Sequence, residues 1–273
     1  MTDLVRRATA DDYAVYTVLF RELGVDDPVA SPERFATELA ARILIYERDG
    51  HAIGYISYYK LADDGYIANL VVAPQARGAR VGEALMLAAA AELRALGVAA
   101  QWQLNVRDDN APAIRLYERM GFLPSYRIVA LRMPWAGVER LPTDAAPIAV
   151  APVCAEDDEG LERALGVLAG RLRIIRARGN RVIVQLRNVD GLPVGLACFD
   201  PQFPGAFPFT VARPALAAPL LRAIAPHARP GDASLQVVVE HDDALTDAFL
   251  GAGAEVRMRL VHYIGPLPRL PVR

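Results

Sequence analysis

Lysine and cysteine are scarce in this chain of 273 residues, and their scarcity narrows what the protein can be. Lys60 is the only lysine among 30 basic residues, and 32 acidic residues leave a formal net charge of −2. This balance provides no polybasic surface for nucleic acid, so we expect any anion to be bound locally. A basic set made almost entirely of arginine indicates a GC-rich bacterial genome.

Cys154 and Cys198 are the only cysteines, and they are far apart in the sequence. Neither belongs to a CxxC pair or has histidines at metal-ligand spacing, so we expect two free thiols, no metal site and a reducing cytoplasmic location. The first residues contain no apolar signal core, and no stretch approaches the roughly 18 apolar residues of a membrane span. We therefore expect a protein that is neither exported nor bound to a membrane.

Local patterns in the first half predict a mixed α/β fold. Asp11 or Asp12 and Ser31 are candidate helix caps, and the turn Asp49-Gly50 predicts a hairpin. The expected order of elements is β-α-α-β-β-β-α-β-α-β, with an antiparallel meander of three strands before the third helix. Helices are expected from Asp11 or Asp12 to Leu23 and over residues 32–40, 81–96 and 111–119.

A break in this pattern divides the chain. Residues 134–152 hold four prolines and show no helical period, so we place a linker at residues 136–148 between domains at residues 1–135 and 149–273.

The second half repeats part of the first. Residues 106–122 align with residues 238–254 without a gap, and each segment is followed by a strand-like stretch. The aligned pairs are Val106 with Val238, Asn110 with Asp242, Tyr117 with Phe249, and Gly121 with Gly253. The rest of the second half also follows the element order of the first, which predicts a duplicated domain. A chance match between two ordinary strand-helix-glycine-strand units is the alternative.

The turn Arg77-Gly78-Ala79-Arg80-Val81-Gly82 is suited to bind an anion. Its glycines let a ligand approach the backbone, and the helix that follows offers unpaired amides and the positive end of its dipole. The two arginines can pair with phosphate oxygens. A nucleotide triphosphate loop is excluded because Glu83 and Ala84 follow Gly82, and a dinucleotide-binding loop lacks its third glycine and its parallel βαβ unit. An ordinary turn with surface arginines remains the alternative.

With the pattern Asn110, Leu116-Tyr117 and Gly121-Phe122 downstream of this turn, residues 1–135 resemble the GCN5-related N-acetyltransferases. The turn is similar to the family signature (R/Q)xxGx(G/A), in which Arg77 and Gly82 match the first and last places. Arg80 replaces the middle glycine. Its side chain would either crowd the loop or lie over the phosphates, and we favour the second.

The resemblance implies an α+β fold with a central, mostly antiparallel mixed sheet flanked by helices, and acetyl-CoA as the acyl donor. It also implies that residues Gly78, Ala79, Arg80, Val81 and Gly82 hold the pyrophosphate through their amides, that the strand through Leu70, Val71 and Val72 pairs with the pantetheine, and that Asn110 contacts the cofactor. Asn110 also precedes Ala111-Pro112, as a helix cap does.

Tyr117 is the candidate general acid. A phenol with a pKa of ~10 is protonated at neutral pH and can donate a proton to the departing thiolate, which is the role of the tyrosine at this place in the family. A core position on an amphipathic helix is the alternative. The oxyanion is expected to be stabilised by a backbone amide near Val71, where this strand and the strand carrying Asn105 separate.

The general base and the acceptor are less well marked. Asp63, Asp64 and Glu22 are candidates for a base, and a water relay or a neutral amine would make a base unnecessary. In the family the acceptor is chosen by the region that corresponds to residues 20–35. Glu22, Asp26 and Asp27 lie there and either attract a cationic amine or serve as caps and surface charge. The expected acceptor is an amine of a small molecule or a peptide.

The second copy lacks the chemical parts of the first. Phe249 has no hydroxyl, and residues 211–221 contain no glycine. We therefore expect a degenerate domain that packs against the first, in a pseudo-dimeric monomer or in a homodimer. A mycothiol-synthase-like tandem enzyme and an acyl-CoA-binding regulator without turnover are the alternative functions.

Overall fold

Two long strands, β6 (Leu123–Pro134) and β12 (Glu255–Pro266), divide their residues between two units of the fold. The structure is a computed structural model that describes residues 2–25 and 28–268. Unit 1 comprises residues 1–125 and 262–273, and unit 2 comprises residues 126–261. The expected linker at residues 136–148 therefore lies inside unit 2, and its first five residues belong to the 3-10 helix Trp135–Arg140.

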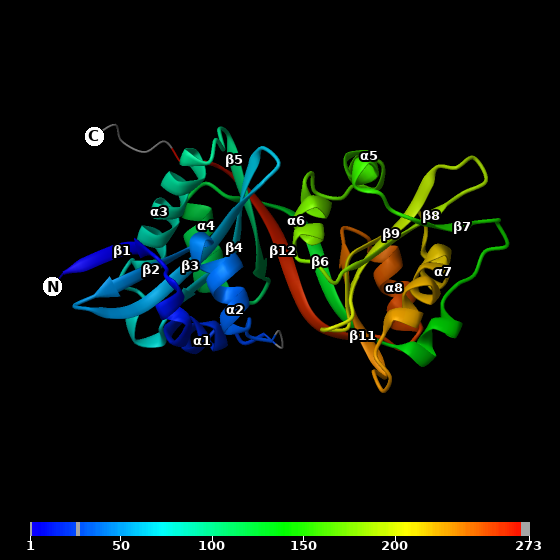
Figure 1. Cartoon of the computed structure of the whole chain (residues 1–273), viewed down its shortest axis with the longest axis horizontal. Coiled ribbons are helices and arrows are strands. Elements are labelled where there is room, and N and C mark those ends of the chain that lie inside the picture. The colour runs from blue at the N-terminus through cyan, green and yellow to red at the C-terminus, as the bar shows by residue number, and fades with distance from the viewer. Residues whose placement is uncertain (1, 26–27, 269–273) are drawn as a thin grey trace. The chain divides into compact units, whose positions relative to one another are not determined.

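Unit 1 is built around a mixed sheet (Figure 1). The first four strands pair antiparallel in sequence order, β4 pairs parallel with β5, and the end of β12 lies beside β5. Its other elements are β1 (Asp3–Arg7), α1 (Tyr13–Arg21), α2 (Pro32–Arg34), β2 (Ile43–Arg48), β3 (His51–Leu61), β4 (Asp64–Val72), α3 (Val81–Ala95), β5 (Gln101–Arg107) and α4 (Ala111–Arg119).

This order is the predicted one, and several boundaries agree closely. Helix α4 spans the predicted residues, and α3 ends at Ala95, two residues before Gly97, which has a left-handed φ of 81°. Ser31 caps α2 by accepting a hydrogen bond from the amide of Arg34 at 3.2 Å. The second predicted helix is less regular than expected, because α2 continues as a π-helix over Phe35–Leu39.

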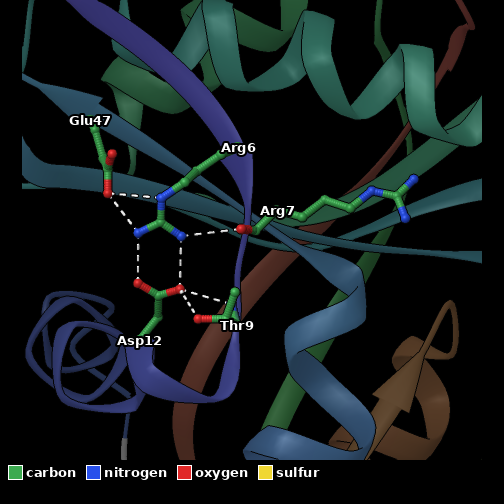
Figure 2. Close-up of polar contacts among 5 residues, drawn as sticks. All are labelled: Arg6, Arg7, Thr9, Asp12 and Glu47. Carbon is green, nitrogen blue, oxygen red and sulfur yellow. Dashed lines mark hydrogen bonds and ion pairs between the residues drawn. The ribbon is translucent and has the colours of Figure 1, made fainter.

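Arg6 on β1 ties the start of α1 to the sheet (Figure 2). Its guanidinium donates two hydrogen bonds to Asp12 at 2.7 and 2.8 Å, two to Glu47 at 2.6 and 2.9 Å, and one to the carbonyl of Arg7 at 3.1 Å. Asp12 also accepts from the amide and the hydroxyl of Thr9 at 2.8 and 3.1 Å. Since Asp12 directly precedes α1, this network fixes where the helix begins.

The core below α1 is aromatic. Phe35 and Tyr55 are fully buried, and Tyr16 stacks on Phe35 with ring centroids 4.8 Å apart. Val71 and Ala73, at the end of β4, belong to the same cluster. This packing holds α1 over the end of β4, where the predicted ligand site begins.

Unit 2 repeats the element order of unit 1. Its strands lie in the order β12-β6-β11-β10-β9-β8-β7, in which β10 and β11 pair parallel. Its other elements are β7 (Ala149–Pro152), α5 (Asp158–Leu165), α6 (Arg171–Ala177), β8 (Val182–Arg187), β9 (Pro193–Asp200), β10 (Gly205–Val211), α7 (Ala217–Ile224), β11 (Ser234–Glu240) and α8 (Asp243–Gly251).

The repeat extends to single caps and turns. Asn110 accepts a hydrogen bond from the amide of Ala113 at 3.3 Å, and Asp242 accepts one from Leu245 at 2.8 Å. After the two helices, Gly121 and Gly253 have left-handed φ values of 86° and 92°. Both segments therefore fold in the same way, as their alignment predicts.

The C-terminal strand completes the sheet of unit 1. Leu267 donates from its amide to the carbonyl of Ala100 at 2.8 Å, and Arg94 on α3 donates to the carbonyls of Leu267 and Pro268. In Figure 1 the whole of β12 is drawn red, and Leu267 and Pro268 follow its end. The residues of β6 after Ser125 belong to unit 2, where this strand pairs antiparallel with β11.

Candidate active site

The two central strands of unit 1 stop pairing halfway along their length. β4 and β5 are in register at Gly65 with Trp102, Tyr66 with Gln103, and Ile67 with Leu104, which is the last pair. The next residue of β4, Ala68, is an extra residue in the ladder with β3. Bulges of this kind bend a strand and end its pairing. The strands thus separate after Ile67, shortly before Val71, near which the family resemblance implies a separation, and we call the opening between them the mouth.

The register decides which backbone groups of β4 face the mouth. The amide of Ala73 donates to the carbonyl of Ile53 at 2.9 Å, and hydrogen-bonded pairs alternate along an antiparallel ladder. Val71 is therefore bonded to Tyr55 of β3, its partner in register. The peptide groups of Leu70 and Val72 point the other way, toward the mouth.

The turn after β4 has a conformation that explains its glycines. Gly78 has a left-handed φ of 81° with open space around it, so glycine is needed there for the backbone alone. At Gly82 a Cβ would lie 3.1 Å from the side chain of Leu116 on α4, so a larger residue there requires Leu116 to shift. Arg80 has φ 58° and precedes α3, which explains why the matching family position is a glycine.

The start of α3 offers free amides. The first helical bond of this stretch runs from the amide of Ala84 to the carbonyl of Arg80 at 3.1 Å, so the amides of Val81, Gly82 and Glu83 precede the regular ladder. Gly78, Ala79 and Arg80 are exposed, and Val81 is buried. An anion can therefore reach these groups from solvent.

Arg77 is partly engaged. Its Nε donates to the carbonyl of Val72 at 3.1 Å. Its Nη2 lies 3.4 Å from a carboxylate oxygen of Glu22, the residue that follows the last turn of α1. Both side chains of this ion pair are more than a third exposed, so the pair is weak.

Tyr117 lies on α4 with its ring packed edge-on to Phe122, at 5.8 Å between centroids. Phe122 in turn stacks on Trp102 of β5 at 5.1 Å. The side chain is 6% exposed, and burial raises the pKa of Tyr117 above its ordinary value. The phenol is therefore protonated throughout the physiological range.

The candidate bases differ in their surroundings. Asp64 accepts hydrogen bonds from the amides of Gln101 and Gln103, both at 2.9 Å, and Glu22 lies beside Arg77. Asp63 is exposed, and Asp26 and Asp27 lie outside the described residues. Glu22 also borders an apolar pocket of about 370 Å³ under α1. That pocket is otherwise lined by Ala14, Val15, Val18, Leu19, Ala52, Ala73, Pro74 and Gln75.

Three polar residues at the mouth were not singled out from the sequence as site residues. Asn69 on β4 and Asn105 on β5 lie just beyond the last pair of these strands. His262, from β12, is fully buried with Nδ1 2.7 Å from Oδ1 of Asn105. The sequence marks His262 only as a single histidine within the apolar stretch of residues 260–265, and this pattern could have made it a candidate site residue.

Unit 2 has different residues at the matching places. Phe249 is fully buried and packs edge-on to Phe209 at 5.7 Å between centroids. Helix α7 is preceded by a 3-10 turn that begins at Pro214 rather than by a glycine turn. Cys154 and Cys198 are free, and burial raises the pKa of Cys198 to about 12.

Within residues 2–25 and 28–268, no helix combines the length and apolar character that crossing a membrane requires. The same residues hold no cluster of three or more histidine, cysteine, aspartate or glutamate side chains arranged to bind a metal ion.

Sequence comparisons identify relatives of unit 1. The model of the Acetyltransferase (GNAT) family matches residues 12–122. A putative [ribosomal protein bS18]-alanine N-acetyltransferase of Bacillus subtilis is 38% identical over 84 residues, which span 31% of this chain and 55% of that protein. An N-alpha-acetyltransferase of Sulfurisphaera tokodaii is 31% identical over 123 residues, which span 41% of this chain and 72% of that protein.

Solved structures match the whole chain in fold. A GCN5-related N-acetyltransferase from Sphaerobacter thermophilus has a TM-score of 0.67 at 17% identity, covering 99% of this chain and 98% of its own. A tandem GNAT protein from the clavulanic acid biosynthesis pathway has a TM-score of 0.60 at 16% identity, covering 98% and 100%. The resemblance and the fold expected from the sequence are thus confirmed, and the chain belongs to the GCN5-related N-acetyltransferase (GNAT) family.

Proposed function

We propose that unit 1 is an acetyl-CoA-dependent N-acyltransferase that acetylates an amine of a small molecule or a peptide. The observation that carries this proposal is the separation of β4 from β5 directly before the free amides of α3. A strand edge beside a helix N-terminus suits an extended ligand that carries amide groups and a diphosphate. The relatives that match unit 1 are named for acetylation of alanine or of α-amino groups.

The residues of the turn fit a diphosphate. In this proposal the amides of Gly78, Arg80, Val81 and Gly82 hold its oxygens, and the dipole of α3 adds to their attraction. The amide of Ala79 joins them by leaving the carbonyl of Ala76, to which it donates at 3.4 Å. Arg80 is exposed and adds a guanidinium. The absence of a side chain at Gly82 leaves room for Leu116 of α4 beside the turn.

The strand edge fits the pantetheine. Leu70 and Val72 offer their peptide groups to its amides, while Val71 stays in the ladder with β3. The donor to the acyl oxygen is then the amide of Leu70 or Val72 rather than that of Val71 itself. Such a donor stabilises the negative charge that develops on this oxygen.

Tyr117 acts as the general acid, and Asn110 fixes the helix that carries it. When bound, acetyl-CoA supplies an acetyl group activated as a thioester. Burial keeps the phenol of Tyr117 protonated, so that its proton is available to the sulfur that leaves. Asn110, at the cap of α4, contacts the cofactor from the first turn of that helix.

Unit 2 is a degenerate copy that supports unit 1 without turnover. Phe249 replaces the acid, and residues 211–217 have no glycine to let a diphosphate approach. In this proposal the catalytic and cofactor-binding residues lie within residues 1–135, and unit 2 serves in packing.

Release of free thiol from acetyl-CoA across a panel of amines tests this function. We expect turnover by the full chain and a fall in kcat of about 100-fold in Tyr117→Phe, since a general acid contributes roughly 10²–10⁴ in rate. Tyr46→Phe is the control, because it removes a phenol that bonds Asp3 on β1. Tight binding of acetyl-CoA by calorimetry, without release on any amine, would favour a regulator instead.

A further inference from the structure

The mouth is flanked by two carboxamide side chains. Asn69 comes two residues after Ile67, and Asn105 comes one residue after Leu104, the last pair of β4 with β5. Both asparagines are half-buried, so a ligand can reach them. The opening therefore carries neutral hydrogen-bonding groups on both of its strands.

Both asparagines point to the sheet face opposite α4. On β4, side chains alternate regularly from Asn69 to Val71, and Val71 packs in the cluster below α1. On β5, Trp102 stacks on Phe122 beside α4, so Asn105, three residues later, points to the other face. Asn69 and Asn105 thus belong to one surface.

Each carboxamide has its oxygen engaged. Ser57 donates from its hydroxyl to Oδ1 of Asn69 at 3.1 Å, and Nδ1 of His262 lies 2.7 Å from Oδ1 of Asn105. The second polar atom of each side chain is the amide nitrogen, which carries two N–H donors and no lone pair for a bond. A ligand at this surface is therefore offered donors.

We propose that Asn69 and Asn105 bind an oxygen of the carbonyl or carboxylate group that is attached to the carbon bearing the reacting amine. The acceptor is then an α-amino carbonyl compound, and a plain alkylamine is a poor substitute because it leaves these donors unpaired. This inference rests on the proposed function for the identity of the reacting amine.

His262 is the positioning residue for Asn105. Its ring is fully buried, so its contact with Oδ1 fixes the orientation of the amide without touching the ligand. The residue lies in the second half of the chain, and unit 1 receives it through β12. Strand β12 thereby contributes a residue to acceptor recognition as well as a strand to the sheet of unit 1.

Titration of a matched pair of products into the full chain saturated with CoA tests this inference. The pair is N-acetyl-L-alaninamide and N-isopropylacetamide, in which a methyl group replaces the carboxamide. We expect the first to bind about tenfold more tightly, as one good hydrogen bond allows. The preference should fall below about twofold in Asn69→Leu, Asn105→Leu and His262→Phe.

Two further variants separate orientation from general damage. Unlike His262→Phe, His262→Asn keeps an amide nitrogen near the place of Nδ1. It should therefore retain most of the wild-type preference for N-acetyl-L-alaninamide. Gln101→Leu removes a carboxamide of the same strand that bonds Asp64 at the paired end, and it should leave the preference unchanged. Thermal melting of each variant establishes that it is folded.

Equal binding of the two products by the wild-type chain would overturn the inference, as would a preference that survives in Asn105→Leu. The same preference in His262→Phe as in the wild type would remove the positioning role. Because the titration involves no turnover, failure of the proposed acyl transfer is seen separately, in the thiol-release assay.

Discussion

Replacing Asp12 by asparagine tests how strongly the network around Arg6 holds the start of α1. The carboxylate of Asp12 accepts two hydrogen bonds from Arg6 and two from Thr9, and its side chain is 9% exposed. Asparagine has nearly the same shape, but since each carboxylate oxygen accepts from Arg6, either orientation of its amide turns an N–H₂ group toward that guanidinium. The variant therefore loses charge-assisted bonds without creating a cavity.

The expected magnitude follows from the pKa of Asp12. The hydrogen bonds from Arg6 lower this pKa from 3.8 to about 2. Since one pKa unit corresponds to about 1.4 kcal/mol, the charged form contributes about 2 kcal/mol to the free energy of unfolding. We expect Asp12→Asn to lower that free energy by about 2 kcal/mol at pH 7.

The dependence on pH has a definite sign. A carboxylate with a lowered pKa stabilises the folded state fully above its unfolded pKa, and this stabilisation is lost as the pH falls from about 4 toward 2. The difference between wild type and Asp12→Asn should therefore shrink over that range. Asp3, whose pKa is also lowered to about 2, is present in both proteins and cancels from the difference.

Urea unfolding followed by circular dichroism at several pH values between 7 and 2 measures this difference. The exposed neighbour provides the control, because Asp11→Asn should change the free energy of unfolding by less than about 0.5 kcal/mol. An Asp12→Asn variant as stable as the control would refute the reasoning. A loss that stays constant from pH 5 to pH 2 would show that the charge is not its cause.

Two further predictions concern the turn and the last strand. Arg80→Gly should raise the melting temperature slightly, because a left-handed non-glycine residue costs about 1–2 kcal/mol, and should weaken CoA binding several-fold by calorimetry. Loss of stability on this change would contradict the assigned conformation. A chain ending at Val261 should melt far below one ending at Pro268, because Arg94 loses its carbonyl partners and β5 loses its neighbour. Equal melting temperatures would show that unit 1 does not need this segment.

Local signals made much of unit 1 predictable. Asn110 before Ala111-Pro112 marks the start of α4, and Gly97 marks the end of α3, because caps depend on neighbouring residues only. The separation of β4 and β5 came from the family resemblance rather than from any local pattern. The assignment of Tyr117 to catalysis and of the turn to the pyrophosphate stays a prediction.

Long-range pairing was not predictable in the same way. β6 and β12 each look like an ordinary final strand of their own repeat, and no residue in either indicates that the strand is shared between units. The contact of His262 with Asn105 depends on this sharing and spans 157 residues of sequence. The left-handed Arg80 escaped prediction for another reason, since a sequence pattern shows a departure from glycine but not its φ.

The place of His262 has a consequence for how the protein is made. At roughly 5–20 residues per second, a ribosome needs on the order of ten seconds or more to proceed from Ser125 to His262. During that interval the newly made first half has an uncovered strand edge at β5 and lacks the imidazole that orients Asn105. A product of interrupted translation would therefore lack the histidine that orients Asn105. Acceptor recognition by unit 1 thus depends on synthesis of β12.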